Sequence, residues 1–317
     1  MKIDIYTHWW PQKAAQRLLE KAKPTTDPIA KKYLERRESR TAVNTLDLRF
    51  RFMDRHPDVL HVLTISNPPP ELFTDPADTA EVCQMANDEM IDLVINYPDR
   101  FIGAAAILPM NDMDLALKEC DRALGELGMH GIRLFTNVLG EKLNAEMLRP
   151  LYEKMVEYDK PIWIHPTEPQ TVSVGQEWLL GWEYETSKAM VDIAGSWVFE
   201  DLPDLKMITH HLGSMIPFFE QRIRWLAPNP RTHKNLKKFH NDTALYGGTA
   251  ALMCGYAFFG ADNILFGTDM PLGTARVPHS AGFMEWTLRA VEAMDIPDEE
   301  KEKIFLLNAI NLLRLAV

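Results

Sequence analysis

Four side chains able to bind a metal or move a proton follow short strand-like runs of this sequence, directly or after one residue. They are His8 after segment 3–6, His165 after 161–164, His211 after 206–209 and Asp269 after 264–268. Residues at the carboxyl ends of parallel strands converge only where the sheet closes into a barrel. Imidazole and carboxylate groups suit a borderline cation such as zinc. The spacing therefore predicts one metal site at the mouth of a barrel.

His165 and Asp269 stand where the chain must leave regular structure. Pro166 follows His165 at once, and Asp269 is flanked by Gly267 and Pro271, residue types that mark tight turns. A carboxylate in such a turn can bind a metal or hold the proton of a metal-bound water. Both residues are therefore predicted to serve the site.

His210 and His211 are neighbours in the sequence. Successive side chains of a strand point to opposite faces, so we expect only one of the two to face the site. We assign that role to His211, as a general acid and base or as the group that activates a metal-bound water. His210 is then interpreted as a core or supporting imidazole.

Tyr6 lies two residues before His8, so the two side chains point the same way on a strand. A His-x-His pair at this place would be a strong sign of a metal site. A phenol, however, has a pKa near ~10 and seldom ligates zinc. Tyr6 is therefore predicted to donate a hydrogen bond or to act as a spacer.

Strand-like and helix-like segments alternate along the chain, which is the pattern of βα units and a parallel sheet. The predicted strands lie near 2–6, 60–66, 101–107, 131–136, 161–165, 206–211, 239–243 and 264–268. The predicted helices lie near 77–96, 114–127, 145–158, 186–200, 283–294 and 298–314. The sequence thus predicts an α/β fold, a TIM-type (β/α)8 barrel, as one domain over residues 1–317.

Two segments exceed a minimal barrel. Residues 11–43 form a polar, helix-prone insertion after the first strand, and residues 166–184 form a Trp-rich loop after the fifth. Loops on the carboxyl face of a barrel usually carry specificity, so both are expected over the substrate or, equally, against a second subunit. The tryptophans that would form an aromatic wall for a flat substrate, or pack at an interface, are Trp9, Trp10, Trp178 and Trp182.

The composition excludes some classes of partner. The 317 residues are 46% hydrophobic and carry a formal net charge of -11, which argues against a nucleic-acid partner because phosphates need clustered Lys and Arg. No run approaches the ~18 apolar residues of a membrane span. Cys83, Cys120 and Cys254 are scattered and suit free thiols of a reducing compartment. We therefore expect a cytoplasmic protein with no membrane partner.

Seven short segments resemble, in the same order, the motifs of one known group of enzymes. They are Asp4-Ile5-Tyr6-Thr7-His8, Arg51-Phe52-Met53-Asp54, Ile164-His165-Pro166, residues 199–206, His211-Leu212-Gly213, residues 259–262 and residues 266–271. The group is the amidohydrolase superfamily branch similar to aminocarboxymuconate-semialdehyde decarboxylase. Each motif alone is weak, but seven in register over nearly the whole chain are specific.

The resemblance implies a distorted (β/α)8 barrel with one divalent metal, zinc first and manganese as the alternative. His8, His165 and Asp269 look like metal ligands, and His211 looks like the residue that activates the metal water or protonates the product carbon. Tyr6 stands where this family usually has His or Glu. Relatives in the branch are commonly dimers, so a homodimer is expected.

The leading hypothesis is a metal-dependent, nonoxidative decarboxylase, a carbon–carbon lyase, of a small aromatic or unsaturated carboxylic acid. His211 or Asp269 would give the proton that replaces carbon dioxide. Arg49 or Arg51 would grip the substrate carboxylate through paired hydrogen bonds. The residues assigned to substrate binding are Tyr6, Trp9, Trp10 and Arg51.

Two other hypotheses stay open. A metal-dependent hydrolase of the same superfamily needs the same ligands and one mobile proton. A structural or regulatory homologue with a decayed site, marked by Tyr6, is the third, because likeness of fold does not establish activity. Bound metal separates the enzymes from the third hypothesis, and solvent oxygen in the product separates hydrolysis from decarboxylation.

Overall fold

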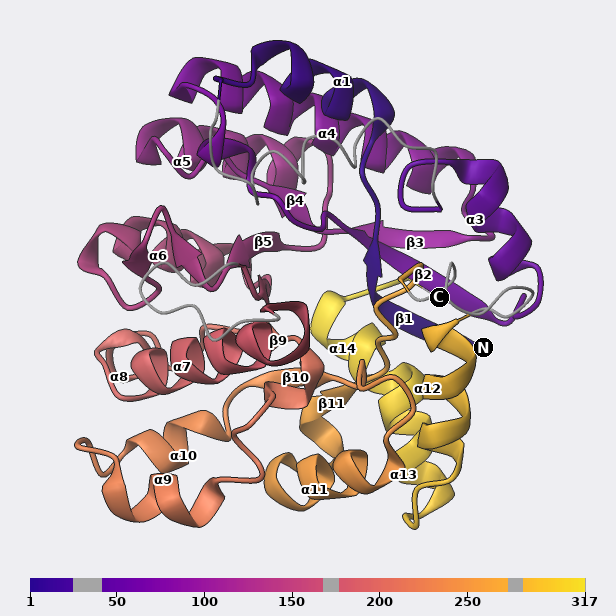
Figure 1. The fold of residues 1–317 in the computed structure, drawn as a ribbon, viewed down its shortest axis with the longest axis vertical. Coiled ribbons are helices and arrows are strands. Elements are labelled where there is room, and N and C mark those ends of the chain that lie inside the picture. The colour runs from indigo at the N-terminus through magenta and orange to yellow at the C-terminus, as the bar shows by residue number, and fades with distance from the viewer. Residues whose placement is uncertain (25–41, 168–176, 273–281, 317) are drawn as a thin grey trace.

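The computed structural model describes residues 1–24, 42–167, 177–272 and 282–316, without the side chains of residues 177 and 178. Parallel strands form its centre and helices surround them (Figure 1). The strands are β1 (Lys2–His8), β2 (Val59–Thr64), β3 (Phe101–Ala104), β4 (Ala106–Ile107), β5 (Ile132–Phe135), β8 (Ile162–His165), β9 (Met207–Thr209), β10 (His240–Asp242) and β11 (Ile264–Leu265). Strands therefore occupy every predicted position.

The helices follow the strands along the chain. They are α1 (Gln12–Lys21), α3 (Leu46–Met53), α4 (Pro76–Asn96), α5 (Met113–Asp121), α6 (Arg149–Tyr158), α7 (Trp182–Ala194), α8 (Val198–Asp201), α9 (Glu220–Leu226), α10 (Thr232–Leu236), α11 (Thr249–Phe259), α12 (Phe283–Glu292), α13 (Asp298–Glu302) and α14 (Asn308–Leu313). Among the described residues, no helix combines the length and the apolar character needed to cross a membrane.

The parallel strands pair in chain order within two sheets, β1-β2-β3 and β11-β10-β9-β8-β5-β4. Only Ala105 separates β3 from β4 along the chain. At the other junction, the Ile5 amide donates to the Phe266 carbonyl at 2.9 Å and the His8 amide donates to the Met270 carbonyl at 2.7 Å. The first and last strands therefore lie side by side. The prediction of an α/β, TIM-type barrel is confirmed, although strand pairing is not continuous around it.

Some local predictions differ from the structure. The helix predicted over 298–314 is interrupted by a π-helical turn between α13 and α14, and the helix predicted over 186–200 is broken at Gly195 between α7 and α8. A short hairpin, β6 (Asn137–Val138) and β7 (Glu141–Lys142), was not predicted. Its turn residues Leu139 and Gly140 both have positive φ, and a leucine gives no signal for such a turn.

The barrel is filled with apolar side chains. Ile3, Ile5, Val62 and Trp163 are buried together inside it, and the Trp163 indole donates to the Ile5 carbonyl at 3.0 Å. A second, larger apolar layer packs the helices onto the strands. Strands buried on both faces are held rigidly, so the residues at their carboxyl ends have fixed positions.

The two predicted insertions are only partly described. Helix α1, from the segment 11–43, lies beside α4 (Figure 1), where the Ala14 amide donates to Glu89 Oε1 at 2.8 Å. Residues 25–41, and residues 168–176 of the loop predicted over 166–184, lie outside the described residues. Their place over the substrate stays a prediction.

Candidate metal centre

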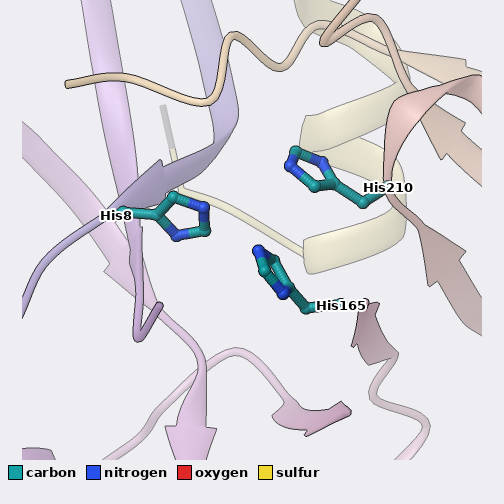
Figure 2. Close-up of side chains that lie close together, drawn as sticks. All are labelled: His8, His165 and His210. Carbon is teal, nitrogen blue, oxygen red and sulfur yellow. The ribbon is translucent and has the colours of Figure 1, made fainter. Parts of the chain in front are cut away.

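Three imidazoles converge at the mouth of the barrel. His8 ends β1, His165 ends β8 and His210 follows β9, and Figure 2 shows their rings facing one space. The ring centroids lie 5.0 Å apart for His8 and His165, 5.2 Å for His165 and His210, and 5.9 Å for His8 and His210. All three side chains are buried, and one nitrogen from each lies within 4.8 Å of the other two. Such a group could hold a metal ion.

Asp269 lies beside two of the three rings. Its Oδ1 lies 2.8 Å from His8 Nε2 and 3.4 Å from His210 Nε2. These three buried atoms make no hydrogen bond of acceptable geometry, so they do not point at one another. Two donor atoms about 2.0 to 2.1 Å from one ion lie about 2.8 to 3.4 Å apart. The spacing and the unmet hydrogen bonds therefore fit ligands of a single cation.

The second nitrogen of each ring has a partner on the protein. His165 Nδ1 contacts the Pro166 carbonyl, His210 Nδ1 contacts Asp242 Oδ2, and His8 Nδ1 lies 3.4 Å from Thr64 Oγ1. Metal-binding histidines usually donate this second N–H to a carbonyl or carboxylate, which fixes the ring and the tautomer. Asp242 was not singled out in the sequence, although it lies near the end of the strand predicted over 239–243.

Both histidines after β9 reach the site, so the expectation that only one would face it is wrong. Their rings stack with centroids 3.9 Å apart, and both group with Asp269. The alternation of side chains holds only within a strand, and β9 ends at Thr209. His211 has a positive φ of 57°, so its side chain does not follow the strand pattern.

His211 has its own carboxylate partner. Its Nδ1 lies 2.7 Å from Glu183 Oε1, near the beginning of α7. Burial alone would raise the pKa of Glu183, but the His211 imidazole beside it lowers that pKa. No sequence pattern marks Glu183, because its place depends on how α7 packs over the barrel.

Burial and neighbouring charges set the protonation of the cluster. Burial lowers the pKa of His8 to about 4 and holds the pKa of His165 well below its usual value. Burial also lowers the pKa of His210, but Asp242 and Asp269 outweigh it and raise that pKa to about 9. Burial would raise the pKa of Asp269, yet His210 and His8 keep it well below its usual range. His8 and His165 are thus neutral, the form that binds metals.

Tyr6 lies beneath this cluster. Its hydroxyl donates to the Ile164 carbonyl at 3.1 Å, and its ring stacks on His210 with centroids 3.9 Å apart. The prediction that Tyr6 donates a hydrogen bond is confirmed. The Arg133 guanidinium lies 5.7 Å from the centre of the Tyr6 ring and 4.9 Å from that of Phe135. Arg133 is buried, and its nitrogens make no hydrogen bond among the described residues.

The arginines of α3 are placed differently from the prediction. Arg51 is 72% exposed and pairs with Asp47 on its own helix at 3.9 Å, so the structure does not bring it to the cluster. Arg49 is fully buried and donates to the His8 carbonyl at 2.7 Å and to Thr7 Oγ1 at 2.8 Å. Arg49 therefore supports the backbone of β1. Arg51 does not reach the barrel, because only one face of α3 can meet it.

The tryptophans predicted as an aromatic wall divide into two groups. Trp9 and Trp10 are buried, and the Trp10 indole donates to the Ser66 carbonyl at 2.8 Å, so these two pack in the core. Trp182 lies edge-on to His165, with ring centroids 6.0 Å apart, and can border a substrate. The side chain of Trp178 lies outside the described part of the chain.

Comparison with known proteins places these features in a family context. The amidohydrolase family model matches residues 3–315. A gamma-resorcylate decarboxylase of Polaromonas sp. strain JS666 is 30% identical over 85% of this chain and 87% of its own. A 2-amino-3-carboxymuconate-6-semialdehyde decarboxylase of Dictyostelium discoideum is 30% identical over 63% of this chain and 59% of its own.

The fold is shared with solved structures. One is a dihydroxybenzoic acid decarboxylase from Polaromonas sp. JS666, solved with bound manganese and the inhibitor 2-nitroresorcinol. It is 24% identical, with a TM-score of 0.77 over 99% of this chain and 96% of that one. The likeness of fold therefore spans almost the whole chain.

Proposed function

Because the chain belongs to the amidohydrolase family, we propose that it is a metal-dependent, nonoxidative decarboxylase of a small aromatic or unsaturated carboxylic acid. The observation that carries the proposal is the place of His8, whose ring centroid lies 5.0 Å from that of His165 and whose Nε2 lies 2.8 Å from Asp269 Oδ1. The relatives named as decarboxylases support the reaction type. Three buried atoms at the site, His8 Nε2, His210 Nε2 and Asp269 Oδ1, have no hydrogen-bond partner in the part of the chain that the structure describes. Such unpaired atoms argue against a decayed site.

One divalent cation, zinc or manganese, would be held by His8, His165 and Asp269. The manganese bound in the Polaromonas relative supports a divalent ion, and imidazole with carboxylate suits both metals. When bound, the cation would hold the substrate carboxylate and a neighbouring oxygen and withdraw charge from the ring.

His211 is the proposed proton donor. Asp269 places Oδ1 at the metal cluster, 2.8 Å from His8 Nε2, and its Oδ2 accepts from the Tyr246 hydroxyl. His211 has Nδ1 2.7 Å from Glu183 Oε1, and its Nε2 would serve the substrate. The proton from Nε2 forms a C–H bond at the carbon that bears the carboxylate. The bond to the carboxylate then breaks, its electron pair returns to the ring, and carbon dioxide leaves.

Arg133 supports an anionic substrate. A buried guanidinium without a hydrogen-bond partner is costly, and a nearby anion offsets that cost. Arg133 lies in the barrel beside Tyr6, whereas the exposed Arg51 is paired with Asp47. We therefore propose that Arg133, rather than Arg51, attracts the substrate carboxylate.

A cytoplasmic homodimer is part of the proposal. Cys83 and Cys120 are free and buried, which suits a reducing compartment. Phe218 is 79% exposed and Trp225 is 78% exposed, and exposed aromatic side chains are typical of an interface. Sedimentation equilibrium would reveal a dimer, and a Trp225→Glu variant would shift it toward monomer.

The test of the function is carbon dioxide release from hydroxylated benzoates, beginning with 2,6-dihydroxybenzoate, by metal-loaded protein. We expect turnover by the wild type and loss of turnover in His165→Ala, with the descarboxy arene as product. Reaction in heavy-oxygen water tests the hydrolase alternative. Solvent oxygen in the product, or full turnover by His165→Ala, would contradict the proposal.

A further inference from the structure

The imidazole of His210 has the features of a ligand rather than of a supporting group. Its Nδ1 is held by Asp242, so its Nε2 faces the space shared with His8 and His165. That Nε2 is buried without a hydrogen bond and lies 3.4 Å from Asp269 Oδ1. A carboxylate that fixes one imidazole nitrogen while the other faces a cation is a recurrent arrangement in metal sites.

Tyr6, in contrast, does not offer its oxygen to the cluster. Its hydroxyl donates to the carbonyl of Ile164, a residue of β8, whereas Tyr6 itself belongs to β1. Its ring lies nearly parallel to that of His210, with an interplanar angle of 15°. Tyr6 therefore serves as the surface on which the His210 ring rests.

His211 does not compete for the same role. It groups with His210 and Asp269, but the group of rings around the shared space is His8, His165 and His210. Its Nδ1 lies 2.7 Å from Glu183 Oε1. His211 therefore lies to one side of the three-histidine group, where a proton donor is useful.

We propose that His210 completes the metal-ligand set with His8, His165 and Asp269, in the place that a residue at position 6 would otherwise fill. The inference rests on the proposed function, because it presumes that the site binds a metal. His210 would release its proton when the ion binds. Three neutral imidazoles and one carboxylate would then leave a divalent ion with a net charge of about +1. That positive charge favours an anionic substrate.

The experiment compares four proteins: the wild type, His210→Asn, His211→Asn and Tyr6→Phe. Zinc affinity is measured on metal-stripped protein by competition with a chelating dye, and the number of histidine ligands is measured by X-ray absorption of the zinc-loaded protein. Circular dichroism without metal checks that each variant folds. The count on the wild type and on His211→Asn does not depend on the folding of His210→Asn.

We expect three imidazole ligands in the wild type and in His211→Asn, and two in His210→Asn. Zinc affinity should fall in His210→Asn by more than the ~100-fold upper range for a supporting partner, and stay unchanged in Tyr6→Phe. Two imidazoles in the wild type, or zinc loss in Tyr6→Phe with retention in His210→Asn, would overturn the inference alone. A wild type that binds neither zinc nor manganese would overturn the proposed function as well.

Discussion

The adjacent residues His210 and His211 each have a carboxylate partner, but the two pairs differ in burial and in restraint. Asp242 is fully buried, and besides His210 it accepts from the His211 amide at 3.0 Å and the Ala244 amide at 2.9 Å. Glu183, the partner of His211, is 26% exposed. A carboxylate fixed by several donors holds a ring in one orientation, whereas a partly solvated one tolerates a change of charge. We call His210 with Asp242 the inner pair and His211 with Glu183 the outer pair. The inner pair suits metal binding, and the outer pair suits proton transfer.

A strained turn makes this difference possible. His211, Leu212 and Ser214 all have positive φ, at 57°, 53° and 55°, a region that is unfavourable for residues other than glycine. Leu212 packs so closely on Gly255 of α11 that a Cβ added there would lie 2.1 Å from Leu212 Cδ2. Packing against α11 therefore holds the turn that places both imidazoles.

The largest expected effect is on the outer pair. His211→Asn should lower kcat by about 10²- to 10⁴-fold, because the proton donor is lost, while metal content stays at the wild-type level. Steady-state kinetics and elemental analysis of the same preparation measure both. Loss of metal from this variant would mean that the two histidines do not divide the roles.

The inner pair should respond in the opposite way. Asp242→Asn should weaken metal binding by about 10- to 100-fold, because His210 loses the carboxylate that orients it. Dye competition measures the affinity, and Asp262→Asn, at an exposed aspartate paired with Lys303, is the control. Unchanged affinity in Asp242→Asn would show that His210 is oriented by other contacts.

The turn at residues 211–214, which lies between the two pairs, should be sensitive to added side-chain volume at its packing partner. Gly255→Ala should destabilise the protein by about 1–3 kcal/mol, because the new methyl group overlaps Leu212 and the close packing must shift. Urea unfolding measures the change. Gly248→Ala is the control, since a Cβ there would lie 3.5 Å from its nearest neighbour, and equal stability of the two variants would contradict the prediction.

The smallest expected effect comes from changing Glu183, the carboxylate of the outer pair. Glu183→Gln should lower kcat by about fivefold or less, because a partly exposed ion pair contributes little and the amide can still accept a hydrogen bond. Metal affinity should not change. Kinetics and dye competition on one preparation test both, and a weakened metal site would show that Glu183 belongs with the inner pair.

The strands could be predicted because apolar runs of strand length recur between helix-like segments. His8, His165 and Asp269 could be predicted for the same reason, since each follows such a run. The rule of alternation failed at His210, because the strand ends at Thr209 and the chain turns there. The choice between Arg49 and Arg51 also failed, because the face that α3 turns inward depends on its packing.

The sequence by itself determined the barrel, the family and the strand ends that carry a metal-binding group, since these follow from local apolar patterns and residue types. Tertiary structure decided that both neighbouring histidines reach the cluster, that Asp242 and Glu183 accompany them, and that Arg133 is buried beside Tyr6. Those features join residues far apart in the chain, and only packing of the whole barrel places them within a few ångströms of one another.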